Sequence, residues 1–166
     1  MKKPGLLRAA IVALLPHLKR DPDKLAMWVE RGNVRSRMTG QRGFAWEYDL
    51  KIVVEDYGKP PEALFFLVVD WLRTQQPDLL SPDSPGFPFE VDVIDEKTFD
   101  VQITLPLREI VTARQTGEGW QLEVVDEAVP LFPDAEPLRA QEGPIASIWV
   151  RSAEGTFQVA PDAQPA

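Results

Sequence analysis

Residues 46–54, Trp-Glu-Tyr-Asp-Leu-Lys-Ile-Val-Val, decide the fold of this chain. Aromatic and aliphatic side chains occupy every second position from Trp46 to Val54, and charged side chains stand between most of them. Because successive side chains of a strand point to opposite faces of a sheet, this alternation predicts a strand with one buried and one solvated face. Such a sheet needs a second layer to cover its apolar face.

Two amphipathic segments can form that covering layer. Residues 6–18 repeat apolar side chains at the helical period, and Pro16 ends or kinks this helix because proline has no backbone N–H. Pro60-Pro61-Glu62 suits the start of a second helix, which must stop before Pro77. The second helix is apolar around most of its circumference, so we expect it at the centre of the core.

Further strands complete the sheet. In chain order, we expect strands at residues 25–30, 46–54, 89–94, 98–110 and 120–125. The short turns 95–97 and 117–119 suit hairpins, and Pro106 requires an edge, a bulge or a break within the fourth strand. The order helix, two strands, helix, three strands predicts an α+β fold of two layers, in which two helices pack on one face of an antiparallel sheet.

The composition changes after Val129. Prolines and glycines between residues 130 and 144 predict an extended connector, followed by a small hairpin of residues 145–151 and 156–159 and a frayed tail. We therefore divide the chain into an α+β domain of residues 1–129 and a C-terminal part of residues 130–166, with connector, hairpin and tail.

The composition excludes several classes of chemistry. The 166 residues include no Cys and a single His, which rules out disulfides, thiolate metal sites and sites with several histidines. His17, at the end of the first helix, suits an interaction with the helix terminus better than a role as a catalytic base. Phosphate-binding glycine loops and the G-x-S-x-G nucleophile motif do not occur. We expect no catalytic residue, no cofactor and no metal.

Two weaker chemical readings stay open. The carboxylate pairs Asp92 with Asp95 and Asp126 with Glu127 could serve a small hydrolase, although they stand near turns where solvation is expected. Tryptophans could stack on single-stranded nucleic acid. Those at positions 46, 71 and 120 fall instead on expected buried faces, and those at 28 and 149 are undecided.

We expect no membrane association. No apolar stretch reaches the roughly 20 residues of a membrane span, and Arg8 interrupts the apolar segment that follows Met1-Lys2-Lys3. The expectation is a product of the cytoplasm.

Charge is distributed unevenly. Residues 1–75 carry 13 Lys and Arg against 9 Asp and Glu, a net charge of +4, and residues 76–166 carry 5 against 17, a net charge of −12. The outward positions of the later strands include Glu90, Asp92, Asp100 and Glu123. These residues form either a solubilising face or an acidic surface that meets the basic part of a second copy, and such head-to-tail contacts close into rings.

The basic part is a polar stretch, residues 31–43, which we expect to form a long hairpin tip. It holds four arginines: Arg31, Arg35, Arg37 and Arg42. Arginine forms bidentate pairs with carboxylates or phosphates, so this tip either binds a partner or stays mobile and solvated.

A series of short motifs in fixed order resembles a known family. It consists of Lys3-Pro4, Leu14-Leu15-Pro16, Arg20-Asp21-Pro22-Asp23, Phe44 and Tyr48, Leu50 to Val54 with Asp56-Tyr57, Trp71-Leu72, Gln76-Pro77-Asp78-Leu79-Leu80 and Phe89-Glu90. In this order the motifs resemble the tail completion protein R family of temperate contractile-tailed bacteriophages, over residues 3–127. The part after Val129 has no counterpart in this resemblance.

The resemblance implies a structural virion protein that acts late in tail assembly, without enzymatic activity or cofactor. The element order is also similar to that of tail terminator proteins, which form a ring, typically six-fold, that ends the tail tube and faces the head-completion proteins. The implied partners are further copies of the chain, the tail tube and sheath, and a head-completion or neck protein. The implied location is the neck end of the virion tail, reached after assembly in the host cytoplasm.

Two site hypotheses follow from this resemblance. In the first, Glu90, Asp92, Asp100 and Glu123 line a lumen that DNA traverses without specific binding, because an acidic wall repels phosphates. In the second, the arginine tip contacts a neighbouring copy or the tube. The alternatives are an assembly factor that acts as a monomer and is absent from the particle, a carboxylate-dependent hydrolase, and a ligand-binding module.

Overall fold

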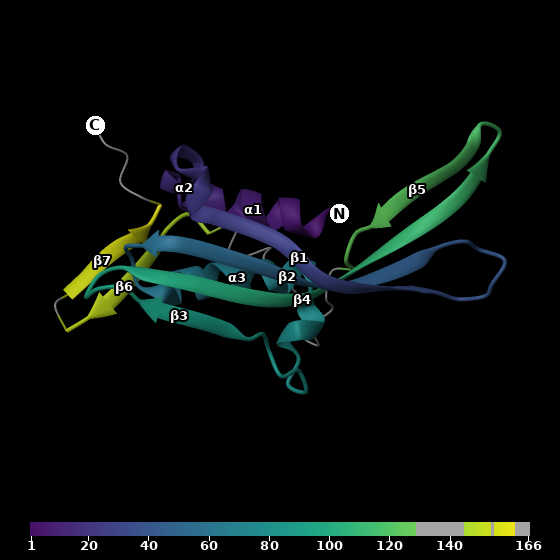
Figure 1. Cartoon of the computed structure of the whole chain (residues 1–166). Coiled ribbons are helices and arrows are strands. Elements are labelled where there is room, and N and C mark those ends of the chain that lie inside the picture. The colour runs from purple at the N-terminus through teal and green to yellow at the C-terminus, as the bar shows by residue number, and fades with distance from the viewer. Residues whose placement is uncertain (129–144, 154, 162–166) are drawn as a thin grey trace.

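The computed structural model describes residues 1–128, 145–153 and 155–161 as an α+β fold (Figure 1). Its helices are α1 (Lys3–Leu14), α2 (His17–Arg20) and α3 (Pro61–Gln75), with short 3₁₀ turns η1 (Pro22–Lys24) and η2 (Pro77–Leu80). Pro16 separates α1 from α2, as the lost backbone donor predicts. The connector expected after Val129 and the end of the tail lie outside the described residues.

The strands form one large antiparallel sheet and one hairpin. The large sheet contains β1 (Leu25–Ser36), β2 (Phe44–Tyr57), β3 (Phe89–Val93), β4 (Phe99–Thr116) and β5 (Gly119–Val125). Its order is β1-β2-β4-β3, and β5 pairs with the far end of β4. The expected C-terminal hairpin consists of β6 (Ile148–Ser152) and β7 (Gly155–Ala160). An α+β fold built mainly on antiparallel strands is therefore confirmed.

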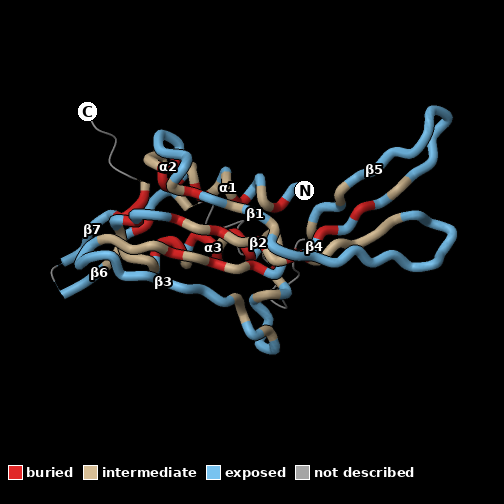
Figure 2. The backbone as a smooth tube through the Cα atoms, viewed as in Figure 1, coloured by how far each residue is buried: buried red, intermediate tan, exposed pale blue. Residues whose placement is uncertain are grey.

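The core lies between the sheet and the helices (Figure 2). Alternate residues of β2, from Tyr48 to Val54, and of β4, from Val101 to Leu107, are at most 4% exposed. They face the buried side of α3, which includes Leu64 and Leu72. The hairpin β6–β7 joins the same core through its own buried residues, Ile148, Val159 and Ala160.

A β-bulge in β1 changes which of its side chains face the core. Val29 pairs with buried Leu50, but the register shifts at the next residue, so that Arg31 pairs with outward-facing Asp49. The strand continues to Ser36, six residues beyond its expected end. The alternation of residues 25–30 is weak in the sequence because apolar Ala26 and Trp28 lie on the exposed face, although the register there is regular and the bulge follows only after Val29.

Pro106 lies within β4 without breaking it. On one side Pro106 pairs with Asp49 of β2. On the other side it falls in the gap between the last residue paired with β3, at Ile103, and the first paired with β5, at Ile110. The neighbouring amides that share its side are bonded: the Thr104 N–H donates to Pro88 and the Arg108 N–H to a glutamine side chain. Proline occupies a local sheet edge, where its missing donor costs nothing.

Candidate interaction surfaces

Two hairpins extend beyond the helices as an arm (Figure 1). We define the arm as residues 31–47, from β1 and β2, and residues 109–125, from β4 and β5. Most of the arm is exposed, in contrast to the adjoining body (Figure 2). Its uncovered apolar side chains include Val34, 69% exposed, and Leu122, 60% exposed. A groove of about 820 Å³ runs between its two hairpins. A single copy therefore leaves much apolar surface of the arm in water.

The four predicted arginines all lie on the arm, but only two lie at its tip. Arg31 and Arg35 belong to β1, where their guanidinium groups contact the carboxylates of Asp49 at 2.6 Å and Glu47 at 3.2 Å. The hydrogen bond to Asp49 raises the pKa of Arg31 above its ordinary value. Arg37 and Arg42 belong to the turn between β1 and β2, and the Arg42 guanidinium lies 4.8 Å from the centre of the Trp120 ring.

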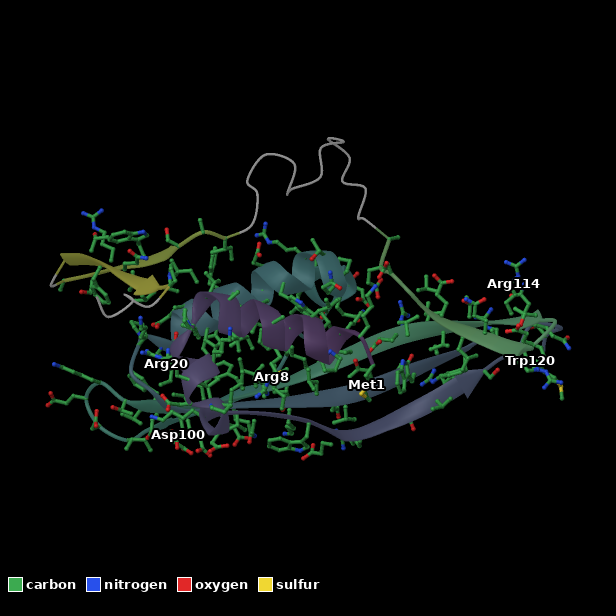
Figure 3. The ribbon with its side chains drawn as sticks, turned by 90° about the horizontal axis from the view of Figure 1, so that it is seen from above. Met1, Arg8, Arg20, Asp100, Arg114 and Trp120 are labelled. Carbon is green, nitrogen blue, oxygen red and sulfur yellow. The ribbon has the colours of Figure 1, made fainter. Side chains whose placement is uncertain are left out.

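The four predicted acidic residues lie in two places on the outward face of the sheet. Asp92 of β3 is paired directly opposite Asp100 of β4, and Glu90 pairs with Gln102, two residues further along β4. Glu123 lies on the arm, where it pairs with Thr112. Figure 3 places Asp100 at the end of the molecule opposite Trp120, so the strands bring three of the four carboxylates together.

The β3–β4 hairpin forms an acidic end of the molecule, which we define as residues 89–96. It combines four carboxylates with three exposed apolar side chains: Phe89 at 56%, Val93 at 69% and Ile94 at 57%. Asp95 fixes the turn, because its carboxylate accepts a hydrogen bond of 2.8 Å from the Lys97 N–H, and this bond lowers the pKa of Asp95.

A buried polar cluster joins the base of the arm to the body, and the sequence analysis did not identify it. The Lys3 ammonium, at the start of α1, donates to Gln76 Oε1 at 2.5 Å and to Glu127 at 2.7 Å. Gln76 Oε1 also accepts the Arg108 N–H at 3.1 Å, and its amide donates to Asp78. Lys3 is 5% exposed and Gln76 is 2% exposed, so each depends on these partners.

The second half of the cluster centres on Glu109, which is 2% exposed. Its carboxylate accepts hydrogen bonds from the Tyr48 hydroxyl and, at 2.8 Å, from the backbone N–H of Lys2. Burial and this carboxylate raise the pKa of Tyr48 well above its ordinary value. The cluster connects α1, α3, β2, β4 and residue 127, so it holds the arm in a defined direction. In the sequence, Lys3 and Gln76 were noted only as members of the motif series. Their contact could not be predicted, because they lie more than 70 residues apart and no local pattern indicates it.

The residues considered for chemistry are dispersed. His17 begins α2, half-buried, and Asp126 and Glu127 pair with Lys2 and Lys3. Within residues 1–128, 145–153 and 155–161, no group of three or more His, Asp or Glu side chains is arranged to hold a metal ion. In the same residues no helix is long and apolar enough to cross a membrane.

The tryptophans follow the expectations only in part. Trp71 is 7% exposed and packs in the core, and Trp46 is half-buried at the base of the arm. Trp120 is 47% exposed on the arm, so its predicted burial is wrong. It lies beyond the reach of the helices that would have covered it. Trp28 and Trp149 are 45% and 58% exposed.

Comparison with known proteins assigns the family. A family model described as P2 phage tail completion protein R (GpR) matches residues 1–128. Tail completion protein R of Escherichia phage P2 is 29% identical over 153 residues, which cover 90% of this chain and 99% of the relative. Because 128 of 166 residues fall short of 90%, this match extends beyond residue 128, and the expectation of no counterpart there is wrong. No solved structure is significantly similar. The resemblance read from the sequence is confirmed, and the chain belongs to the P2 phage tail completion protein R family.

Proposed function

We propose that this tail completion protein caps the tail tube as a homo-oligomeric ring, with six copies, and contributes to the junction between tail and head. The observation that carries the proposal is the polarity of the molecule: an arm with exposed apolar side chains and the basic residues 31–43 stands at one end of the sheet, and the acidic end stands at the other (Figure 3). A molecule with unlike surfaces at its two ends can contact its neighbours head to tail, and such contacts close into rings. The ring would form in the host cytoplasm and remain at the neck end of the virion tail.

The outward face of the sheet is the proposed lining of the lumen. Glu90, Asp92 and Asp100 lie on this face, and Glu123 lies on the same face further along the arm. Thr112, the partner of Glu123, is twelve residues from Asp100, and an even spacing keeps both on one side of a strand. Fixed negative charge on a lumen wall repels the phosphates of passing DNA and prevents the genome from sticking.

The arm is the proposed contact surface toward the neighbouring copy and the tube. Arg37 is the arginine best placed for it, because Arg31 and Arg35 already pair with carboxylates of their own copy and Arg42 lies over the Trp120 ring of the same arm. The tube protein, the sheath and a head-completion or neck protein are the proposed further partners.

Electron microscopy of tails assembled with and without this protein tests the proposal. We expect a ring of density at the end of the tube that faces the head, with several copies per tail, and tubes of irregular length when the protein is absent. A protein absent from purified tails that assemble normally around it would instead be a monomeric assembly factor, and the proposal would be wrong.

Charge reversal tests the lumen separately. Tails carrying Asp100→Lys and Glu123→Lys, the two lumen residues outside the β3 strand, should assemble and then release DNA slowly, since the wall would attract phosphate. Asp83→Lys, at an exposed position of the loop before β3, is the matched control and should leave DNA release unchanged. Normal release from the double variant would exclude Asp100 and Glu123 from the lumen.

A further inference from the structure

We infer that the arm of one copy docks on the acidic end of the next copy, so that residues 89–96 are the receptor surface for the neighbour's arm. The inference rests on the proposed self-association and goes further, because it assigns the two surfaces that meet. Three observations carry it: the apolar content of both surfaces, the opposite sign of their charge, and their places at opposite ends of one molecule.

Both surfaces have an apolar centre that one copy leaves exposed. On the arm, Val34, Trp120 and Leu122 are between 47% and 69% exposed, and Met38 at the tip is fully exposed. On the acidic end, the three apolar side chains Phe89, Val93 and Ile94 are between 56% and 69% exposed. Exposed apolar side chains gathered in one part of the surface mark interaction sites in folded proteins.

The tip hairpin of residues 31–43 and the acidic end carry opposite charge. Residues 31–43 contain four arginines and no acidic residue, whereas the rest of the arm holds Arg114 against four glutamates, at positions 47, 109, 118 and 123. Residues 89–96 contain Glu90, Asp92, Asp95 and Glu96 and no basic residue. On β3 the carboxylates of Glu90 and Asp92 lie on the outward face of the sheet, and Phe89 and Val93 lie on the face of the helices. The arm has the same division, with Arg35 and Arg114 outward and Leu122 on the side of the helices. Each surface therefore has an apolar face and a charged face, and the charges select the partner and its register.

The position of the two surfaces prevents them from meeting within one copy. Arg114 and Trp120 lie at one extremity of the sheet and Asp100, beside the acidic end, at the other (Figure 3). The buried cluster of Lys3, Gln76 and Glu109 fixes the arm pointing away from the body. Contact therefore requires a second copy, and a row of copies joined in this way is head to tail.

Both participating strands also have a free edge. In the described part of the chain, β3 pairs only with β4, and β5 pairs only with β4. Unpaired edges accept a further strand when they approach one another, so the docked arm can add main-chain hydrogen bonds to the contact.

Cysteine cross-linking tests the contact directly, because the chain contains no natural cysteine. In the full chain carrying Met38→Cys and Ile94→Cys, a short bis-maleimide should join copies into dimers, trimers and larger species. Either single variant should give at most dimers, at a low yield. Met38→Cys with Leu80→Cys, on η2 away from the acidic end, is the matched control and should also give a low yield.

A yield no higher than that of the control would overturn the inference. Species that stop at a doubly linked dimer would overturn the head-to-tail arrangement, because two copies lying antiparallel would then satisfy both surfaces. A ring seen on tails together with a failed cross-link would overturn this inference and leave the proposed function intact.

Charge exchange supplies the second measurement. Arg37→Glu with Arg42→Glu, and separately Asp92→Lys with Glu96→Lys, should each weaken self-association at least about tenfold, since like charges then face each other. The protein that carries all four substitutions should regain the association of the native chain. All substituted side chains are exposed, so folding, checked by circular dichroism, should be unchanged. Failure of the combined variant to recover, with both pairs weakened, would overturn the inference.

Discussion

Replacing Gln76 with leucine should lower the free energy of unfolding more than a substitution at a nearby surface position, because Gln76 lies in the buried cluster at the base of the arm. The substitution keeps an apolar stem of similar size and removes both polar atoms of a side chain that is 2% exposed. The Lys3 ammonium then keeps only Glu127, and the Arg108 N–H loses its acceptor in the gap between β3 and β5.

The size of the effect follows from those two groups. A buried donor left without an acceptor costs about 1–3 kcal/mol, and the ammonium stands at the upper end because it is charged. Burial of the apolar leucine side chain offsets part of this loss in the free energy of unfolding. We therefore expect a loss of about 3 kcal/mol in the free energy of unfolding, or roughly 6–12 °C in midpoint for a chain of this length.

Urea unfolding followed by circular dichroism measures this loss, with an unchanged dependence on denaturant as the sign that the folded state is intact. Gln75→Ala, one residue earlier on α3 and partly exposed, is the matched control and should change stability by less than about 0.5 kcal/mol. Adding Lys3→Met to Gln76→Leu should cost about 1 kcal/mol less than the sum of the two single losses, since the partners fail together. Equal stability of Gln76→Leu and the control, or strict additivity, would refute the assignment of this cluster as the joint.

Three further outcomes are expected. In a Tyr57→Phe variant Tyr48 is the last tyrosine, and the absorbance of the folded protein should show no tyrosine ionisation near pH 10. The pKa of Tyr48 in the folded state is raised above the ordinary value of 10.0. The free energy of unfolding should therefore be at its full value below pH 10 and fall as the pH rises above it, because only the unfolded state loses the proton there. Ionisation of Tyr48 in the folded protein near pH 10 would contradict its burial against a carboxylate. Gly32→Ala should cost about 1–3 kcal/mol, because its new methyl group would stand 2.9 Å from Tyr48 Cβ, whereas Gly40→Ala meets nothing within 4 Å and should be nearly neutral; equal melting temperatures would contradict the register of β1. Pro106→Ala should change stability by no more than about 1 kcal/mol, since no ladder bond is gained or lost at a local edge, and a larger loss in urea unfolding would place this residue elsewhere.

The elements that the sequence predicted well are those whose burial is regular over many residues. The alternation from Trp46 to Val54 identified β2, and the broad apolar surface between Pro61 and Pro77 identified α3, because both patterns record one continuous contact with the core. The break at Pro16 was equally local, since a missing backbone donor acts on its own helix.

The alternation of apolar residues did not by itself predict which side chains are buried. Trp120 pairs with Gln115, on the same face of β4 as the core residues from Val101 to Leu107, yet it is exposed, because the helices end before the sheet does. The period of two residues predicts on which face of the sheet a side chain lies. Whether that side chain is buried depends on how far the helices extend over that face. The alternation likewise placed Glu123 and Asp100 on the same outward face. It did not show that Glu123 lies on the arm and Asp100 at the opposite end of the sheet.

From the amino-acid sequence we could predict the α+β class, the positions of most strands and the concentration of basic residues before residue 76 and acidic residues after it. These properties depend on residue type and on short-range spacing, which a chain displays before it folds. The tertiary structure decided the arm, the bulge that turns Arg31 toward Asp49 and the cluster that joins Lys3 to Gln76 and Glu127. Each depends on segments far apart in the chain meeting at one point, and no local pattern of residues records such a meeting.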